Sequence, residues 1–231
     1  MSQIPHHAED DPDQLRASMV RQQLCQRDIR DESVLQVMQK VPRHEFVPDQ
    51  SVREAYADKP LAIGDGQTIS QPYIVALTTQ LVRPLPTDRA LDIGTGSGYQ
   101  AAVLAELSGQ VHSIETIGLL ASQARTRLQR LGYDDTITVH HADGSQGWPS
   151  AAPFDIIVAA AAPESVPPAL LQQLGNGGRL AIPVGKTQQV LMLFEKDKSG
   201  AITQTEVTRV AFVPMIVGTG TDHNHAEHDA T

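Results

Sequence analysis

The hydrophobic positions in the first third of the chain recur mainly at helical spacing. Leu15, Met19 and Leu24 lie one to two turns apart, as on the buried face of a helix. Helices are predicted over residues 12–28, over residues 32–40 and from Pro72 onward. The stretch 54–71 shows no such period and is predicted to be irregular. The chain is therefore expected to begin with a helical part.

From residue 90 onward, short apolar runs alternate with helical stretches. The apolar runs predict strands over residues 90–94, 111–115, 136–143, 154–162, 178–185, 188–196 and 205–217. Helical spacing between them predicts helices over residues 100–108, 119–132 and 167–174. The run at 154–162 is apolar at successive positions, which is typical of a strand buried on both faces of a parallel sheet. Repeated strand–helix units predict a doubly wound α/β sheet.

The net charge is concentrated at the two ends of the chain. The protein has 27 acidic and 18 basic residues, and its formal net charge is −9. Residues 1–13 hold four of the acids and residues 221–231 hold three, with no Lys or Arg in either stretch. Disordered acidic tails are therefore predicted over 1–13 and 219–231. The remaining chain has 20 acids, 18 bases and no basic stripe, so we expect no nucleic-acid partner.

A single domain is expected between the tails, because no linker or internal repeat divides residues 14–218. Residues 14–80 would supply the N-terminal helices and a substrate and cofactor loop, and residues 81–218 the sheet core. No apolar run approaches the ~18 residues that a membrane span needs, and the first residues do not resemble a secretory signal. A single cysteine, Cys25, excludes an internal disulfide framework. We therefore expect a cytoplasmic protein that has no membrane partner.

A glycine-rich loop follows the first predicted strand of the sheet and opens a helix. It reads DIGTGSG, from Asp92 to Gly98. Glycines let a ligand approach the backbone closely and leave amide N–H groups pointing at it. The same glycine spacing can be aligned with a dinucleotide fingerprint, so the loop predicts a nucleotide-like cofactor without choosing between classes.

Three acids at the ends of successive strands narrow the choice of cofactor. Asp92 at the start of the loop would repel a pyrophosphate and attract the ammonium and sulfonium of S-adenosyl-L-methionine. Glu115 lies 23 residues further on, where a carboxylate can accept both ribose hydroxyls. Asp143 ends the third strand and is placed to accept the adenine amino group. Each acid alone could be a solvated loop residue, but together they predict one S-adenosyl-L-methionine crevice at the carboxyl edge of the sheet.

The chain resembles the protein-L-isoaspartate O-methyltransferases over about residues 15 to 217. The matching segments are, in order, VPRHEFVP, AYADKPLAIGDGQTISQPYIVA, LDIGTGSGYQAAVLA, VHSIE, HHADGSQGW, FDIIVAAAAPESVPPALLQQL, GGRLAIPVG and AFVPM. GQTISQPY, residues 66–73, is the specific one, because other S-adenosyl-L-methionine methyltransferases share the glycine loop but not this stretch. The resemblance implies a Rossmann-like, mostly parallel seven-stranded sheet with an N-terminal helical extension. It also implies that the last two strands are exchanged relative to most methyltransferases of this fold.

The resemblance also implies an activity and a partner. The family methylates the free α-carboxyl of L-isoaspartyl residues in damaged proteins and peptides, and the ester initiates repair through a succinimide. We expect a monomer with isoaspartyl proteins and peptides as its substrates. Asp65, Thr116 and Ala159 depart from residues common in the family, which leaves fine specificity open rather than the activity.

The resemblance further implies individual site residues. Ser70 corresponds to the active-site serine. The cofactor-binding residues would be Thr68, Ile69, Ser70, Asp92, Gly94, Gly96, Ser97, Glu115, Asp143 and Gly144.

Ser70 has two interpretations. A carboxyl group with a pKa around 4 is already ionised at pH 7, so its attack on a sulfonium methyl needs no general base. A hydroxyl that orients one carboxylate oxygen is sufficient, and the G-x-S-x-G elbow of a hydrolase is absent. Taken from the local residues alone, however, Ser70 is also suited to cap the helix that begins at Pro72. The sequence leaves both roles open.

Parts of the sequence are compatible with other functions and sites. A methyltransferase for small carboxylates, a binding module without turnover and a nicotinamide oxidoreductase are the alternatives to a repair enzyme. His223, His225 and His228 could bind a metal, but a solvated tail is favoured and no metal is expected. Tyr73 and Trp148 could line a substrate groove or belong to the core.

Overall fold

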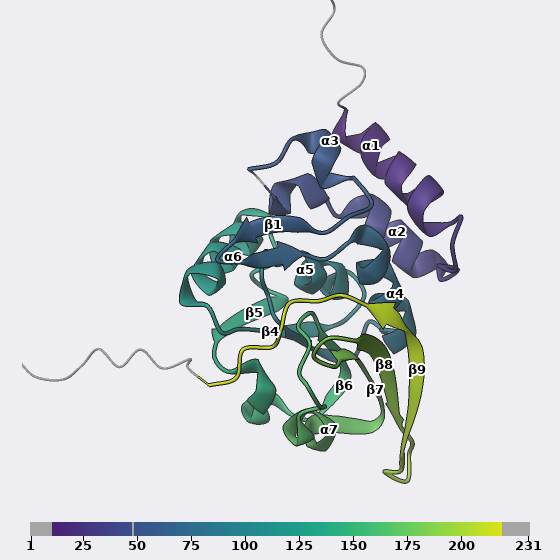
Figure 1. The fold of residues 1–231 in the computed structure, drawn as a ribbon, viewed down its shortest axis with the longest axis vertical. Helices are drawn as coiled ribbons and strands as arrows, with labels where there is room; N and C mark the ends of the chain where they lie inside the picture. The colour runs from purple at the N-terminus through teal and green to yellow at the C-terminus, as the bar shows by residue number, and fades with distance from the viewer. Residues whose placement is uncertain (1–10, 48, 219–231) are drawn as a thin grey trace, which may run out of the picture.

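The N-terminal part of the protein is helical and packs against one side of a sheet domain (Figure 1). The computed structural model describes residues 11–47 and 49–218, so most of both predicted tails lies outside the described residues. The first part contains α1 (Pro12–Met19), a π-helical turn η1 (Val20–Leu24), α2 (Glu32–Lys40), a 3-10 turn η2 (Arg43–Phe46) and α3 (Val52–Ala55). Asp11 caps α1 through its side chain, which accepts the Asp13 N–H at 2.9 Å. The helix predicted over residues 12–28 is shorter in the structure: α1 ends at Met19, and the π-helical turn that continues it ends at Leu24.

A small hairpin interrupts the stretch that was predicted to be irregular. Strands β1 (Leu61–Gly64) and β2 (Gln67–Ile69) pair antiparallel. Their turn places Gly64, Asp65 and Gly66 at φ values of +97°, +49° and +71°. Glycine adopts this left-handed region without penalty, and aspartate tolerates it. The strands have only four and three residues, so no period-two pattern could reveal them in the sequence.

The remaining elements alternate between strand and helix. They are α4 (Pro72–Val82), β3 (Arg89–Ile93), α5 (Tyr99–Ala105), β4 (Gln110–Glu115), α6 (Gly118–Arg130), β5 (Ile137–His141), 3-10 turns η3 (Gly144–Gln146) and η4 (Pro149–Ala151), β6 (Phe154–Ala159), α7 (Pro168–Gln173), β7 (Leu174–Val184), β8 (Gln189–Lys196) and β9 (Ile202–Val210). Seven strands form one sheet in the order β5-β4-β3-β6-β7-β8-β9. The first five are parallel, whereas β8 and β9 are antiparallel to their neighbours.

This arrangement confirms the predicted mostly parallel, doubly wound sheet and shows where the last strands lie. Strands β8 and β9 follow β7 in chain order, with β9 at the edge. The last strand was predicted over 205–217, but β9 ends at Val210. Residues 211–218, called here the C-terminal segment, leave β8 and reach the end of β6, where Pro214 forms an isolated parallel bridge with Ala162. In Figure 1 this yellow segment crosses the ends of the parallel strands.

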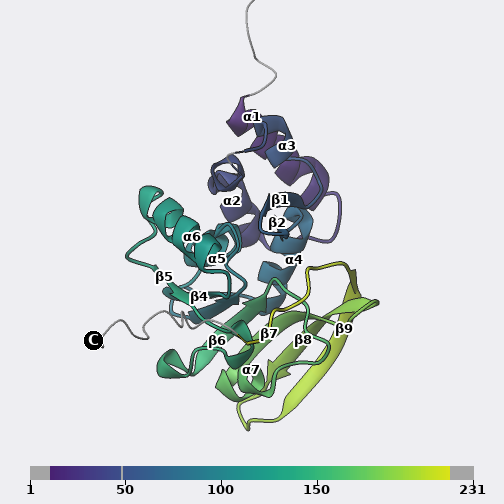
Figure 2. The same cartoon turned by 60° about the vertical axis from the view of Figure 1, so that its left-hand side comes forward.

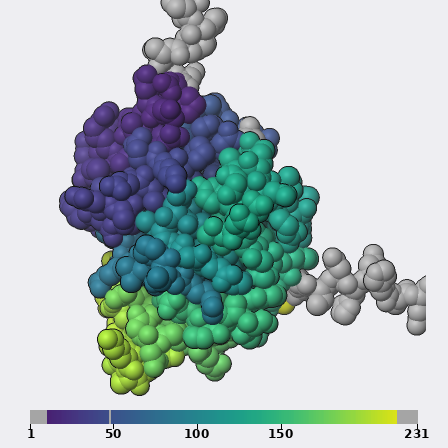
Figure 3. Space-filling model, turned by 180° about the vertical axis from the view of Figure 1, so that it is seen from behind, coloured from purple at the N-terminus to yellow at the C-terminus, as the bar shows by residue number. Residues whose placement is uncertain are grey.

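Both faces of the parallel part of the sheet are buried, whereas the edge strand β9 is mostly exposed. Val111, Ile156 and Val158 pack on one face with residues of α4, α5 and α6, in the same cluster as the N-terminal helices. Leu91, Ile93 and Ile157 pack on the other face with Leu170 of α7. Figure 2 shows α5 and α6 on one side of the sheet and α7 on the other. Seen from behind, the N-terminal helices form a continuous surface with the sheet domain (Figure 3). In the described part of the chain, no helix is long and apolar enough to cross a membrane.

Candidate active site

The glycine loop takes a backbone course that other residues rarely adopt. Gly94, Gly96 and Gly98 have φ values of +90°, +51° and +91°. A Cβ atom on Gly96 would lie only 3.1 Å from Ile63 Cδ1 of β1, so glycine leaves room for the hairpin above the loop. The N–H groups of Gly94 and Thr95 both donate to the Ile114 carbonyl at 2.8 and 3.1 Å. The loop is therefore anchored to β4, between the sheet edge and the β1–β2 hairpin.

A narrow cavity lies at this loop. Its lining comes from the hairpin, the glycine loop, the ends of β4 and β6, the start of η3 and the C-terminal segment: Gln67, Thr68, Ile93, Gly94, Gly96, Ile114, Glu115, Thr116, Ile117, Gly144, Ala160, Ala161, Val213, Pro214, Met215 and Ile216. Five residues predicted to bind the cofactor are thus brought together: Thr68, Gly94, Gly96, Glu115 and Gly144. The structure places Ile69, Ser70, Asp92, Ser97 and Asp143 outside this lining.

Glu115 connects the glycine loop to the end of β4. Its side chain is buried, and Oε2 accepts the Gly96 N–H at 2.7 Å. Oε1 accepts the Ile117 N–H at 3.0 Å. Each carboxylate oxygen has a second lone pair, so Glu115 can still accept two hydroxyl groups from the cavity side. This geometry suits the predicted contact with a ribose.

Asp92 lies behind the loop rather than on the wall of the cavity. It is fully buried, and its Oδ2 accepts a 2.7 Å hydrogen bond from Ser113 Oγ, which is itself 2.6 Å from Thr95 Oγ1. The pKa of Asp92 is raised to about 7, mainly by burial and to a smaller extent by the charge of Glu115, against the opposing effect of the Ser113 hydrogen bond.

The second carboxylate oxygen of Asp92 indicates whether a cationic cofactor fits beside the glycine loop. Oδ1 is buried and has no hydrogen-bond partner among the described residues. A buried carboxylate oxygen without a donor is unfavourable unless positive charge lies nearby. The ammonium and sulfonium of S-adenosyl-L-methionine would supply such charge, so the residues present fit this cofactor. Direct contact with Asp92 stays a prediction.

Asp143 holds the C-terminal segment over the end of the sheet. Oδ1 accepts the Ser145 N–H and thereby caps η3, while Oδ2 accepts the Gly218 N–H, both at 2.9 Å. Ala162, just after β6, exchanges two backbone hydrogen bonds with Val213 and Met215 at 2.9 and 2.8 Å. These contacts fix the segment as one wall of the cavity. The predicted contact between Asp143 and adenine stays open, since each carboxylate oxygen retains a lone pair.

Ser70 lies between β2 and α4 and faces a different space. The N-cap of α4 is Gln71 and has no side-chain cap hydrogen bond, so the interpretation of Ser70 as a helix cap is wrong. Among the described residues, its hydroxyl has no recorded hydrogen-bond partner. Ser70 lines a groove of about 440 Å³, called here the Ser70 groove, with Pro60, Thr68, Gln71, Ile74, Ala160, Arg209, Val210, Ala211, Phe212 and Val213. Thr68, Ala160 and Val213 also line the cavity, so the two spaces adjoin.

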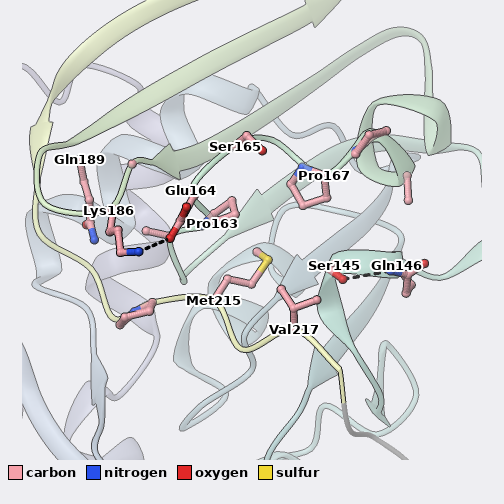
Figure 4. Close-up of a pocket in the computed structure, with 15 residues that line it drawn as sticks. Ser145, Gln146, Pro163, Glu164, Ser165, Pro167, Lys186, Gln189, Met215 and Val217 are labelled. Atoms are coloured by element: carbon pink, nitrogen blue, oxygen red, sulfur yellow. Dashed lines mark hydrogen bonds and ion pairs between the residues drawn. The ribbon is translucent and has the colours of Figure 1, made fainter.

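The C-terminal segment also forms one wall of a larger groove of about 720 Å³ on its other side (Figure 4). Pro214 and Met215 line both this groove and the cavity at the glycine loop. Glu164 and Lys186 form an exposed ion pair of 2.7 Å at its margin. The segment thus separates two spaces, and its side chains define the inner one.

Trp148 and its neighbours support the η3 side of the cavity. The backbone N–H of Trp148 donates to Gln173 Oε1 at 2.7 Å, and Gln173 Nε2 donates to the Gln146 carbonyl at 2.8 Å. The Trp148 ring stacks on His140 with 3.8 Å between centroids, and His140 is hydrogen-bonded to His112 at 3.0 Å. Burial, followed by the charges of His112 and Arg125, lowers the pKa of His140 to about 4. Trp148 therefore packs beside the cofactor cavity and is absent from the lining of the Ser70 groove.

Comparison with known proteins identifies the family. The family model described as protein-L-isoaspartate(D-aspartate) O-methyltransferase matches residues 14–220. The chain belongs to this family. It is 53% identical to protein-L-isoaspartate O-methyltransferase 2 of Polaromonas sp. over 80% of this chain and 88% of that protein. It is 52% identical to the protein-L-isoaspartate O-methyltransferase of Opitutus terrae, over 87% of this chain and 86% of that one.

A solved structure is similar over nearly the whole fold. The crystal structure of a protein-L-isoaspartate O-methyltransferase from Plasmodium falciparum, in complex with S-adenosyl-L-homocysteine, matches with a TM-score of 0.77 and 26% identity. The match covers 90% of this chain and 99% of that one. Family membership thus confirms the resemblance drawn from the sequence motifs.

Several site residues were missed by the sequence reasoning. Val213, Pro214, Met215 and Ile216 were assigned to a strand but line the cavity. Pro214 within the predicted strand was the signal that could have shown this, because proline is rare inside sheets. Ile117 lies two residues after the predicted strand 111–115, and Ala160 lies near the end of the predicted strand 154–162, so their position at the carboxyl edge was the available indication. Arg209 in the Ser70 groove had no signal in the sequence.

Proposed function

We propose that this protein transfers a methyl group from S-adenosyl-L-methionine to the free α-carboxyl of L-isoaspartyl residues in damaged proteins and peptides. The observation that carries the proposal is the position of Ser70, which lines a groove adjoining the cavity of the glycine loop and Glu115. The names of the curated relatives support the substrate, and the S-adenosyl-L-homocysteine in the Plasmodium falciparum structure supports the cofactor.

The residues of the cavity would hold the cofactor from several sides. Glu115 accepts the ribose hydroxyls, and Gly94 and Gly96 allow close approach of the backbone. Thr68 and the C-terminal segment close the side toward the Ser70 groove. The cofactor supplies a methyl group that is already activated by the positive sulfonium. The protein then has to align the acceptor with that methyl group and exclude water.

Ser70 performs the alignment in this mechanism. Its hydroxyl donates a hydrogen bond to one oxygen of the substrate carboxylate, which leaves the other oxygen free to attack. Methyl transfer to that oxygen would need no general base, because the carboxyl is ionised at pH 7 and no proton has to be removed. Complete positioning of two reactants can lower a barrier by about 7–11 kcal/mol, and the Ser70 hydrogen bond supplies the part of this that a single hydrogen bond is worth, ~1 kcal/mol. The product ester then loses methanol as a neighbouring amide nitrogen closes the succinimide, and this initiates repair.

The deciding experiment uses tritiated cofactor and two peptides that differ only in an aspartyl or isoaspartyl linkage. We expect label in base-labile form on the isoaspartyl peptide and none on the aspartyl peptide. Equal labelling of both, or labelling of neither, would contradict the proposal. A monomeric state, a cytoplasmic location and a single domain over residues 14–218 are further proposals that rest on the sequence alone.

A further inference from the structure

Arg209 stands at the margin between two grooves. It lies near the end of β9, opposite Val190 on β8, and its side chain is exposed. It lines the Ser70 groove, and it also lines a second groove of about 510 Å³ over the ends of β8 and β9. Strands β8 and β9 form an antiparallel pair, called here the β8–β9 hairpin. A peptide that continues from the Ser70 groove over this end of the β8–β9 hairpin would therefore pass Arg209.

The guanidinium of Arg209 has no hydrogen bond or ion pair recorded within residues 11–47 and 49–218, and it is the only charged side chain lining the Ser70 groove. Other cations of this part of the molecule are paired. Arg27 forms a 2.7 Å ion pair with Asp58, and Lys59 lies 3.5 Å from Glu54. Arg209 is thus an available cation in the groove that contains the proposed active-site hydroxyl.

The chemistry of a guanidinium indicates what it would bind. Its planar fork of N–H donors matches a carboxylate in a bidentate arrangement. The carboxylate that becomes methylated is a poor candidate, because an ion pair would stabilise the negative charge of the oxygens and make them weaker nucleophiles toward the methyl group. The neutral Ser70 hydroxyl orients that group with less loss of nucleophilicity. Arg209 is therefore suited to a second carboxylate, elsewhere on the peptide.

We propose, building on the function proposed above, that Arg209 selects isoaspartyl peptides with an acidic side chain close to the isoaspartyl residue. Ser70 and Arg209 line one groove of about 440 Å³, so the two groups of a bound peptide that they contact lie close together along it. An extended peptide advances ~3.3 Å per residue, so the acidic side chain belongs within about two residues of the isoaspartyl position.

The test compares isoaspartyl hexapeptides that carry Glu or Gln at each of the two positions before and after the isoaspartyl residue. For the wild-type protein, Glu at one or more positions should raise kcat/KM by about 2- to 5-fold, mainly through KM, as expected for a partly exposed ion pair. Arg209→Gln should remove this preference while the cofactor Kd stays unchanged. Arg209→Lys should retain part of it.

Lys198 provides a matched control on the same hairpin. It lies in the β8–β9 turn, at the opposite end of β9 from Arg209, and Lys198→Gln removes the same charge without touching either groove. This variant should keep the wild-type preference. Equal kcat/KM for Glu and Gln peptides in the wild-type protein, or a preference that survives Arg209→Gln, would overturn the inference. Absence of labelling on every peptide would instead overturn the proposed function, and this inference with it.

Discussion

The cofactor cavity and the Ser70 groove adjoin, yet their polar groups are treated in opposite ways. Around the cavity, both oxygens of Glu115 and both of Asp143 accept backbone N–H groups, so the structure holds them in place without a ligand, and Oδ1 of Asp92 is the exception. In the groove, neither the Ser70 hydroxyl nor the Arg209 guanidinium has a recorded partner in the described chain. This difference is expected if the cavity binds one unchanging cofactor and the groove binds peptides of varied sequence. Fixed side chains lower the free-energy cost of binding the cofactor, and unpaired donors in the groove can pair with different peptides.

The largest effect is expected at Asp92, the buried charge behind the cavity. Its pKa is raised to about 7, mainly by burial, so the unfolded chain ionises near pH 4 while the native state keeps its proton until about pH 7. The wild-type protein should therefore lose stability as the pH rises through this window, by on the order of 4 kcal/mol. Asp92→Asn has no group to titrate and should lack this loss.

Urea unfolding of the cofactor-free protein at a series of pH values from 4 to 8 measures this difference. The exposed Asp134 supplies a control, because Asp134→Asn should follow the wild-type profile. Parallel profiles for Asp92→Asn and wild type would show that Asp92 does not carry a raised pKa.

The second effect concerns Glu115 and would show whether the preorganised acid binds ligand. Glu115→Gln replaces charge-assisted hydrogen bonds worth ~1.5–3 kcal/mol each, so the Kd for S-adenosyl-L-methionine should rise by about 10- to 100-fold. The peptide KM should change little. Calorimetry measures the Kd directly.

Glu106→Gln is the matched control for Glu115. Glu106 also has two partners, Lys40 at 2.6 Å and Tyr133 at 3.0 Å, but it lies outside the cavity lining. It should bind the cofactor normally. The role of Glu115 would be refuted by a Kd that is as little affected as that of Glu106→Gln.

The third effect concerns Ser70, on the groove side. Ser70→Ala should lower turnover on an isoaspartyl peptide by about 5- to 10-fold, since one hydrogen bond is worth ~1 kcal/mol or slightly more. Its melting temperature and cofactor Kd should remain unchanged because the hydroxyl makes no cap bond. Ser70→Thr should retain more activity than Ser70→Ala.

Ser51 is the control for Ser70, because its replacement should lower stability and leave turnover unchanged. Its Oγ accepts the Glu54 N–H at 3.2 Å and caps α3. Ser51→Ala should cost ~1 kcal/mol of stability and leave turnover per folded molecule intact. If Ser70→Ala behaved like Ser51→Ala, Ser70 would be structural and the mechanism would lose its residue.

The smallest effect is expected at the stack of His140 on Trp148. Burial lowers the pKa of His140 to about 4, below the ordinary value near 6.5, so acid pH favours the unfolded state, which binds the proton more readily. Trp148 is the sole tryptophan. Its fluorescence should fall as pH drops through about 4 because a charged imidazole quenches a stacked indole.

His140→Phe keeps an aromatic ring against Trp148 and removes the titrating group, so this fluorescence change should disappear. His141→Gln should leave it in place, since His141 contacts the Thr116 carbonyl instead of Trp148. A fluorescence titration that persists in His140→Phe would show that another group affects Trp148.

The features that the sequence revealed depend on local spacing. The glycines at 94, 96 and 98, and acids at the ends of successive apolar runs, predicted a crevice at the carboxyl edge of a parallel sheet. The structure brings Gly94, Gly96 and Glu115 to one cavity. The motif GQTISQPY predicted the family, and the family model confirms it over residues 14–220.

The features that escaped prediction depend on contacts between distant segments. The two strands of the β1–β2 hairpin are too short for a visible period, and the C-terminal segment reads as strand although it crosses the end of β6 at Ala162. Ser70 precedes a proline-initiated helix and looks like a cap, yet the helix takes Gln71 at that position. Local pattern could not show which of these surfaces would meet.

The sequence by itself determined the alternation of strands and helices, the glycine loop and the family, because these follow from periodicity and from residues that only one backbone course accommodates. The tertiary structure alone decided which polar groups are satisfied and which are available. Asp92 is a fully buried acid in the folded chain, and Glu115 and Asp143 accept hydrogen bonds from the backbone N–H groups of distant segments. Ser70 and Arg209, 139 residues apart in the chain, came to line one groove. Burial and hydrogen-bond partners depend on how the whole chain packs, and these set both the pKa of an acid and the availability of a donor.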